Sequence, residues 1–139
     1  MAESVKVHPE ILDEMLAHAR RDPHIECCGL LAGREGVITA IFSATNSLAS
    51  ATAYEIAPRE LFHLFRTLRD GELQHLGQYH SHLSTENIPS PTDIGQAGYP
   101  DQAYFIVTLQ SNAANPVRAF SIRDGGVREI EIVVTRTEE

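Results

Sequence analysis

The sequence lacks a long apolar run, a cluster of basic residues and a spaced set of cysteines, and each absence excludes a class of protein. No segment approaches the ~20 apolar residues of a membrane-spanning helix, so we expect no membrane insertion. Eleven Lys and Arg residues against 19 Asp and Glu give a net charge of −8, so we expect no nucleic-acid partner. The N-terminal residues show no basic patch followed by an apolar run, and a cytoplasmic location is predicted.

Cysteine is scarce as well, and its placement excludes a disulfide framework. The two cysteines, Cys27 and Cys28, are adjacent, which normally precludes a bridge between them. We expect both to pack as small apolar side chains rather than to bind a metal.

The chain has 139 residues, enough for one hydrophobic core, so a single domain spanning residues 1–139 is predicted. Apolar residues recur at helical spacing in residues 9–20 and 58–70. The remaining apolar segments favour strands, and together they predict an α/β fold of the mixed α+β kind. The expected strands are a hairpin within residues 29–42, a short strand at 54–56, strands at 76–82 and 104–109, and a hairpin within residues 117–134.

Two histidines near the end of the expected strand 76–82 form a candidate metal site. His80 and His82 are two residues apart, so their side chains leave the same face of the strand. Asp93 falls in the first turn of a helix for which Ser90 is the expected N-cap and Pro91 the first helical residue. The loop at residues 83–89 can bring Asp93 back to the imidazoles. Two imidazoles and one carboxylate leave the fourth tetrahedral position of zinc to water, as in catalytic zinc sites.

The pattern as a whole is more informative than the histidine pair alone. With seven histidines in the chain, about 0.35 His-x-His pairs arise by chance, but Ser90 and Asp93 at their positions lower this expectation to about 0.001. A water-activating site also needs a base. Glu26 is the candidate, because it precedes an apolar strand that could lie beside the histidines; its alternative is a surface carboxylate. Ser90, just before Pro91, is an N-cap by its local sequence.

These residues resemble the JAMM, or MPN+ (Mov34/MPN/PAD-1), metallopeptidase family, whose motif is a glutamate followed at a distance by His-x-His-x7-Ser-x2-Asp. Here Glu26 is followed by His80, His82, Ser90 and Asp93. The segments at residues 26–33 and 58–61 are similar to those of the short prokaryotic members, so the resemblance covers nearly the whole chain.

The resemblance implies a curved mixed β-sheet flanked by helices, related to the cytidine deaminase architecture. It also implies one Zn²⁺ per chain, bound by His80, His82 and Asp93. Glu26 would act as general base toward water, and Ser90 would hydrogen-bond the developing oxyanion. A deaminase is excluded, because the His-x-Glu and Pro-Cys-x-x-Cys signatures are absent.

For the substrate, the resemblance implies a sulfur-carrier or ubiquitin-like protein that ends in Gly-Gly, cleaved as a peptide or isopeptide after this tail. The tail would add to an exposed edge of the sheet, and such edges would also permit a homodimer. The short loop at residues 83–89 leaves no room for the insertions of deubiquitinases, which favours sulfur-carrier processing. Two alternatives stay open: an inactive MPN scaffold that acts as a binding module, and a zinc hydrolase of a small-molecule amide.

Overall fold

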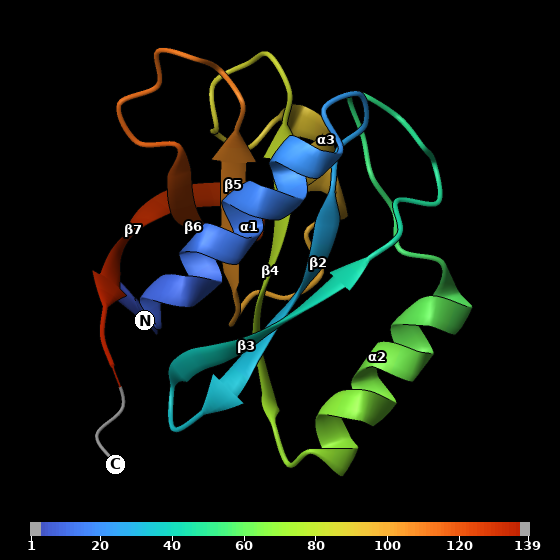
Figure 1. Ribbon diagram of the computed structural model, residues 1–139, viewed down its shortest axis with the longest axis vertical. Coiled ribbons are helices and arrows are strands. Elements are labelled where there is room, and N and C mark those ends of the chain that lie inside the picture. The colour runs from blue at the N-terminus through green and yellow to red at the C-terminus, as the bar shows by residue number, and fades with distance from the viewer. Residues whose placement is uncertain (1–3, 137–139) are drawn as a thin grey trace.

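The structure is a computed structural model that describes residues 4–136 (Figure 1). Strands predominate, and three helices lie between them. Within the described residues, no helix combines the length and the apolar character needed to cross a membrane. In chain order the elements are β1 (Ser4–Val7), α1 (Pro9–Arg21), β2 (Cys28–Arg34), β3 (Val37–Ala44), α2 (Pro58–Asp70), β4 (Gln74–His82), α3 (Pro91–Gln96), β5 (Ala103–Thr108), β6 (Val117–Arg123) and β7 (Gly126–Val134).

The two long helices form where the apolar spacing predicts them. Pro9 and Pro58 open α1 and α2, where a missing backbone N–H costs no helical hydrogen bond. One face of α1 is buried through Ile11, Met15 and Ala19. Leu68 is the buried residue of α2, whose opposite face lies in solvent. Each helix is therefore stabilised mainly by packing one apolar face against the strands.

The two expected hairpins are confirmed, and both turn on residues with positive φ. Glu35 and Gly36 join β2 to β3 with φ of 55° and 79°. Asp124 and Gly125 join β6 to β7 with φ of 52° and 80°. Two successive residues of this kind give the turn whose twist matches that of paired strands.

The strands close into a barrel in the order β1-β3-β2-β4-β5-β6-β7. The expected mixed α+β fold is confirmed, with parallel pairs β1–β3, β1–β7 and β4–β5 and antiparallel pairs elsewhere. The sequence does not predict strand β1, which closes the sheet. Its contact with β3 is short, with Lys6 opposite Val37 and Val7 opposite Ile38. Residues 39–44 of β3 and residues 126–130 of β7 each pair with a strand on one side only, so the described strands leave short open edges.

The expected strand at residues 54–56 is wrong, because this segment is bonded within its own loop. The backbone N–H of Glu55 donates to Oδ1 of Asn46, and its carbonyl accepts from the backbone N–H of Ser47. These bonds satisfy the backbone groups that a neighbouring strand would otherwise pair.

The two faces of the sheet have different roles. On the inner face, α1 packs against Tyr79 of β4 and Phe105 of β5. On the outer face, α2 packs against Leu30 and Ala32 of β2, and Figure 1 shows α2 standing at the side of the barrel. Because side chains alternate along a strand, His80, next to the inward Tyr79, points to the outer face. The candidate site is thus separated from the main core by the sheet itself.

Candidate metal centre

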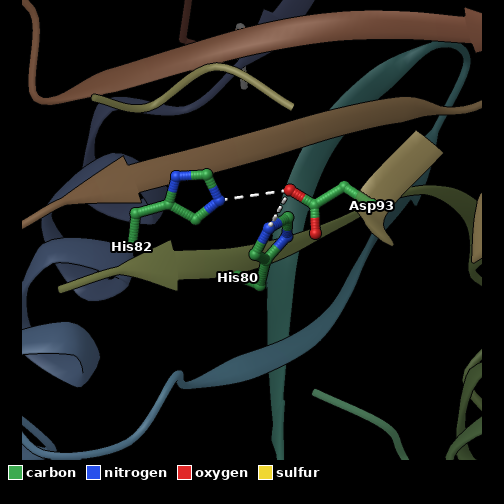
Figure 2. Close-up of side chains that lie close together, drawn as sticks. All are labelled: His80, His82 and Asp93. Carbon is green, nitrogen blue, oxygen red and sulfur yellow. Dashed lines mark hydrogen bonds and ion pairs between the residues drawn. The ribbon is translucent and has the colours of Figure 1, made fainter. Parts of the chain in front are cut away.

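Three side chains that the sequence motif placed together meet at the end of β4 and the start of α3 (Figure 2). Nε2 of His80 and Nε2 of His82 each lie 3.1 Å from Oδ2 of Asp93. All three residues offer one ligand atom, and these atoms lie within 4.8 Å of one another. The two histidines are buried, and the Asp93 side chain is only 8% exposed. The arrangement is that of a nearly closed polar site rather than of a solvated surface cluster.

Local hydrogen bonds place Asp93 at this position. The hydroxyl of Ser90 accepts from the backbone N–H of Asp93, and the Asp93 carboxylate accepts from the backbone N–H of Ser90. This capping box confirms the expected N-cap and Pro91 as the first residue of α3. It fixes the Asp93 side chain on the side of the helix that faces β4.

Side-chain hydrogen bonds hold the loop between β4 and α3 against β5 and the segment that follows it. Nδ2 of Asn87 donates to the carbonyls of Ile106 and Asn115, and the hydroxyl of Thr108 donates to the carbonyl of Thr85. The loop therefore returns to β5, and so α3 starts beside the histidines. This course of residues 83–89 agrees with the expectation that the loop brings Asp93 back to the imidazoles.

The donor set fits a bound metal ion. Ring atom Nδ1 of His82 lies 2.8 Å from the carbonyl of Glu86, so Nδ1 donates there and the lone pair of Nε2 is directed to the site. Within residues 4–136, Nε2 of His80 is buried and has no hydrogen-bond partner, although Oδ2 of Asp93 is near. Donor atoms around a tetrahedral zinc ion lie about 3.3 Å apart, close to the spacing found here. A metal ion would satisfy this unpartnered nitrogen.

The electrostatics of Asp93 and His80 also favour a cation. Burial by itself would raise the pKa of Asp93, but the imidazoles of His80 and His82, each 3.1 Å from its carboxylate, hold that pKa well below its usual range. Burial lowers the pKa of His80. Asp93 is therefore an anion and His80 a neutral imidazole near neutral pH, which are the protonation states of metal ligands.

Glu26 reaches the site from the segment that leads into the neighbouring strand, β2. Strands β2 and β4 are antiparallel, with Cys28 opposite His80, and continuing this register puts Glu26 opposite His82. Glu26 is 4% exposed, and its buried Oε1 has no hydrogen-bond partner in the part of the chain that the structure describes. Burial raises its pKa to about 7, and the charges of His82 and Asp93 also act on it. A buried carboxylate with this pKa can both accept and release a proton at neutral pH.

The unpaired carboxylate should affect the stability of the metal-free protein in a pH-dependent way. The pKa of Glu26 is raised from 4.5 to about 7, so the folded state loses stability as pH rises through this interval. We expect Glu26→Gln to increase the free energy of unfolding in chelator at pH 8 by up to about 3 kcal/mol, and by almost nothing at pH 4. Urea unfolding at both pH values measures this, and an equal effect at both would contradict it.

Two residues missed by the sequence analysis build the wall beside the metal centre. The ring of Tyr54 stacks on His80, with centroids 4.6 Å apart. Asn46 is buried, and its Nδ2 donates to the carbonyls of Glu26, Ser50 and Ala53. Asn46 thereby joins the loop that carries Tyr54 to the backbone of the candidate base. Nothing in their local sequence marks these residues, because their partners are distant along the chain.

Stacking on Tyr54 should orient His80 for metal binding. We expect Tyr54→Phe to keep the zinc affinity within about twofold, and Tyr54→Ala to weaken it about tenfold, as for other residues that orient a ligand. Competition with a zinc-binding dye measures the affinity, and circular dichroism checks that both variants fold. Equal weakening in both variants would assign the effect to the hydroxyl instead, and no weakening in Tyr54→Ala would remove the role altogether.

The two cysteines lie outside the candidate ligand set. Both are buried free thiols. Burial raises the pKa of Cys27 to about 11 and that of Cys28 to about 12. Such thiols are protonated at neutral pH and are poor metal ligands, as expected.

A pocket of about 400 Å³ opens beside the metal centre. Its wall includes Tyr54, Ile56, Leu61, Gln78 and Tyr99. Because Tyr54 also stacks on His80, the pocket and the candidate ligands share this side chain. The lining is largely aromatic and aliphatic, which suits part of an extended chain next to the reacting bond.

Comparison with known proteins places this geometry in a family. Residues 8–123 match the model for prokaryotic homologs of the JAB domain. The CysO-cysteine peptidase of Mycobacterium tuberculosis is 35% identical over 125 residues, covering 88% of this chain and 86% of that protein. The desampylase of Haloferax volcanii is 35% identical over 101 residues, covering 68% and 73%.

A solved structure agrees over nearly the whole chain. Protein DSY2949 from Desulfitobacterium hafniense superposes with a TM-score of 0.84 at 32% identity, covering 97% of this chain and 95% of that one. The family match spans the strands and helices that carry His80, His82, Asp93 and Glu26. The chain belongs to the prokaryotic JAB group of the JAMM/MPN family.

Proposed function

We propose that this protein is a zinc-dependent peptidase or isopeptidase that cleaves after the C-terminal Gly-Gly of a sulfur-carrier or ubiquitin-like protein. The observation that carries the proposal is the meeting of three candidate ligands with the buried carboxylate of Glu26 on one face of the barrel, where Oε1 of Glu26 has no hydrogen-bond partner among the described residues. A binding module would not need a carboxylate left unpaired in this position, since such a group lowers stability. The names of the two relatives, a CysO-cysteine peptidase and a desampylase, support hydrolysis at a protein conjugate.

His80, His82 and Asp93 would hold the metal ion. Two imidazoles, which bind a metal ion in their neutral form, and one carboxylate make a set that zinc accepts, with one position left for the reactants. A bound zinc ion would polarise the scissile carbonyl and lower the pKa of water toward about 7. The hydrogen bond from His82 to Glu86 and the stacking of Tyr54 on His80 would keep both rings in place.

Glu26 and Ser90 would carry out the proton and charge steps. Glu26 takes a proton from water as the water oxygen attacks the glycine carbonyl, and it then gives that proton to the leaving amine as the C–N bond breaks. Ser90 uses its oxygen to accept the Asp93 N–H, which leaves its hydroxyl hydrogen to donate to the oxyanion. The products are a free glycine carboxylate and an amine.

The preference for a Gly-Gly tail follows from the approach to the site. The metal centre is nearly closed, with ligand side chains no more than 8% exposed, so a tail without side chains reaches it most easily. The pocket lined by Tyr54, Ile56 and Leu61 would receive residues further upstream. A small free amide would make little use of this pocket, which favours a protein tail over the small-molecule alternative.

Intact mass spectrometry tests the proposal. The zinc-loaded protein is incubated with sulfur-carrier and ubiquitin-like proteins that carry a short C-terminal extension or conjugate, beside Glu26→Gln as control. Cleavage after Gly-Gly that disappears in the control is the expected result. If no protein is cleaved while zinc is bound, the proposal fails. An inactive scaffold or a hydrolase of a small-molecule amide is then favoured.

A further inference from the structure

Helix α2 presents an exposed face that combines positive charge with an aromatic ring. We call this the α2 basic face and define it by Arg59, Phe62, His63, Arg66 and Arg69, all of which are exposed. At 100° per residue these positions fall within about one third of the helix circumference. The opposite side of the helix packs on the outer face of β2 through residues 61, 64, 65 and 68.

The composition of this face contrasts with that of the chain. The protein has a net charge of −8, yet three of its 11 Lys and Arg residues lie on this face. Within residues 4–136, the ion pairs found leave Arg59, Arg66 and Arg69 without an anionic partner. Asp70 lies at the C-terminal end of the face, and Glu60 is turned away to accept from the backbone N–H of Thr45. These arginines can therefore pair with an outside anion.

An exposed phenylalanine distinguishes the face from an ordinary solvated helix. Phe62 is 60% exposed, more than the other large apolar side chains of the described residues. The guanidinium of Arg66 lies 5.9 Å from the centre of its ring, which holds the ring beside the charges. Exposed aromatic and arginine side chains are the residues that contribute most to protein interfaces.

The face adjoins the approach to the metal centre. Leu61, on the same turn of α2 as Phe62, lines the pocket that it shares with Tyr54. Tyr54 in turn stacks on His80. A protein bound to α2 would thus have a short path for its tail along the pocket to the candidate ligands. A second copy of this chain bound there would gain nothing from this path, and so the adjacency favours the substrate.

We propose that the α2 basic face binds an acidic, partly apolar patch on the folded body of the small protein whose tail is cleaved. The inference rests on the proposed function and specifies its partner. Because the rest of the chain is acidic, an acidic partner is repelled elsewhere and directed to this face. Phe62 contacts the apolar part of the patch, and Arg59 and Arg66 pair with its carboxylates.

The test separates docking from chemistry by using two substrates. One is an acidic ubiquitin-like protein with a C-terminal Gly-Gly coumarin amide, and the other is a short peptide with the same last residues and the same amide. For the double variant Arg59→Glu/Arg66→Glu we expect KM for the protein to rise about tenfold or more at low salt, with kcat unchanged. Cleavage of the peptide should stay as in the wild type. Phe62→Ala should raise the same KM with less dependence on salt.

A matched control carries the same change of net charge elsewhere. Lys6→Glu/Arg128→Glu alters exposed residues of β1 and β7 and should leave both substrates unaffected. Binding of the protein probe is also measured by fluorescence anisotropy on Glu26→Gln enzyme, so a weakened affinity in the α2 variant supports docking even without cleavage.

Two outcomes would overturn the proposal. The first is an unchanged KM and an unchanged affinity for the protein probe in the double variant, which would leave the proposed function standing if the peptide is cleaved. The second is a change in self-association by sedimentation velocity without a change in substrate affinity, which would assign the face to a second copy of this chain.

Discussion

Replacing Glu26 by Gln is expected to lower kcat by about 10³-fold while zinc stays bound. The amide keeps the size of the side chain but neither accepts a proton from water nor returns one to the leaving amine. Since Glu26 is not one of the three grouped candidate ligands, the metal content should not change. Steady-state cleavage of a Gly-Gly coumarin amide, together with metal analysis of the same preparation, measures both quantities.

The control for this variant is a glutamate close to the site that lies in solvent. Glu86 is exposed, and its backbone carbonyl, not its carboxylate, accepts from His82. We therefore expect Glu86→Gln to keep kcat within about twofold, since exposed charges interact weakly. A Glu26→Gln enzyme with near wild-type kcat would show that another group acts as the base.

Replacing Asp93 by Asn is expected to remove tight zinc binding, weakening it by more than about 100-fold, and to abolish cleavage with it. Asparagine keeps the shape, and its oxygen can still accept from the backbone N–H of Ser90, so the start of α3 should survive. What it loses is the negative charge between the two imidazoles. Chelator competition measures the affinity, and circular dichroism checks the fold.

Asp101 provides the comparison for Asp93. It is an exposed carboxylate paired with Arg123, outside the metal centre. Asp101→Asn should therefore leave zinc affinity and kcat unchanged within about twofold. If Asp93→Asn still binds zinc as tightly as the wild type, Asp93 is not a ligand and the assignment of the centre is wrong.

The features that the sequence predicts well are those determined by neighbours in the chain. The proline openings of α1 and α2, their apolar spacing and the two hairpin turns all depend on residues within a few positions. The capping box of Ser90 and Asp93 is equally local, as it joins residues three apart. The strand period places His80 and His82 on one face by the same reasoning.

The features that escape prediction depend on partners far along the chain. Strand β1 has four residues and is a strand only because β3 and β7 pair with it. Residues 54–56 are apolar enough for a strand, but their backbone is bonded by Asn46 and Ser47 within the loop. In both cases, local propensity does not predict which hydrogen-bond partner the backbone takes.

The candidate site also has a part that local sequence predicts and a part that depends on distant residues. The three candidate ligands lie within the short segment of residues 80–93, and their pattern can be recognised in the sequence. The place of Glu26 depends on the register between β2 and β4, which at this end pairs Cys28 with His80, far apart in the chain. The stacking of Tyr54 on His80 depends on a loop whose course is set by Asn46. The sequence motif identifies the reacting groups, whereas the residues that hold these groups in place are brought to the site by the fold.

A zinc titration of the metal-free protein tests the central claim most directly. Bound zinc and the rate of Gly-Gly coumarin amide cleavage are followed in the same samples, for the wild type and for Asp93→Asn. We expect the rate to rise in proportion to bound zinc and to reach its plateau at one zinc ion per chain in the wild type only. Full cleavage without zinc, or stoichiometric tight zinc binding and cleavage in Asp93→Asn, would contradict a catalytic metal centre at His80, His82 and Asp93.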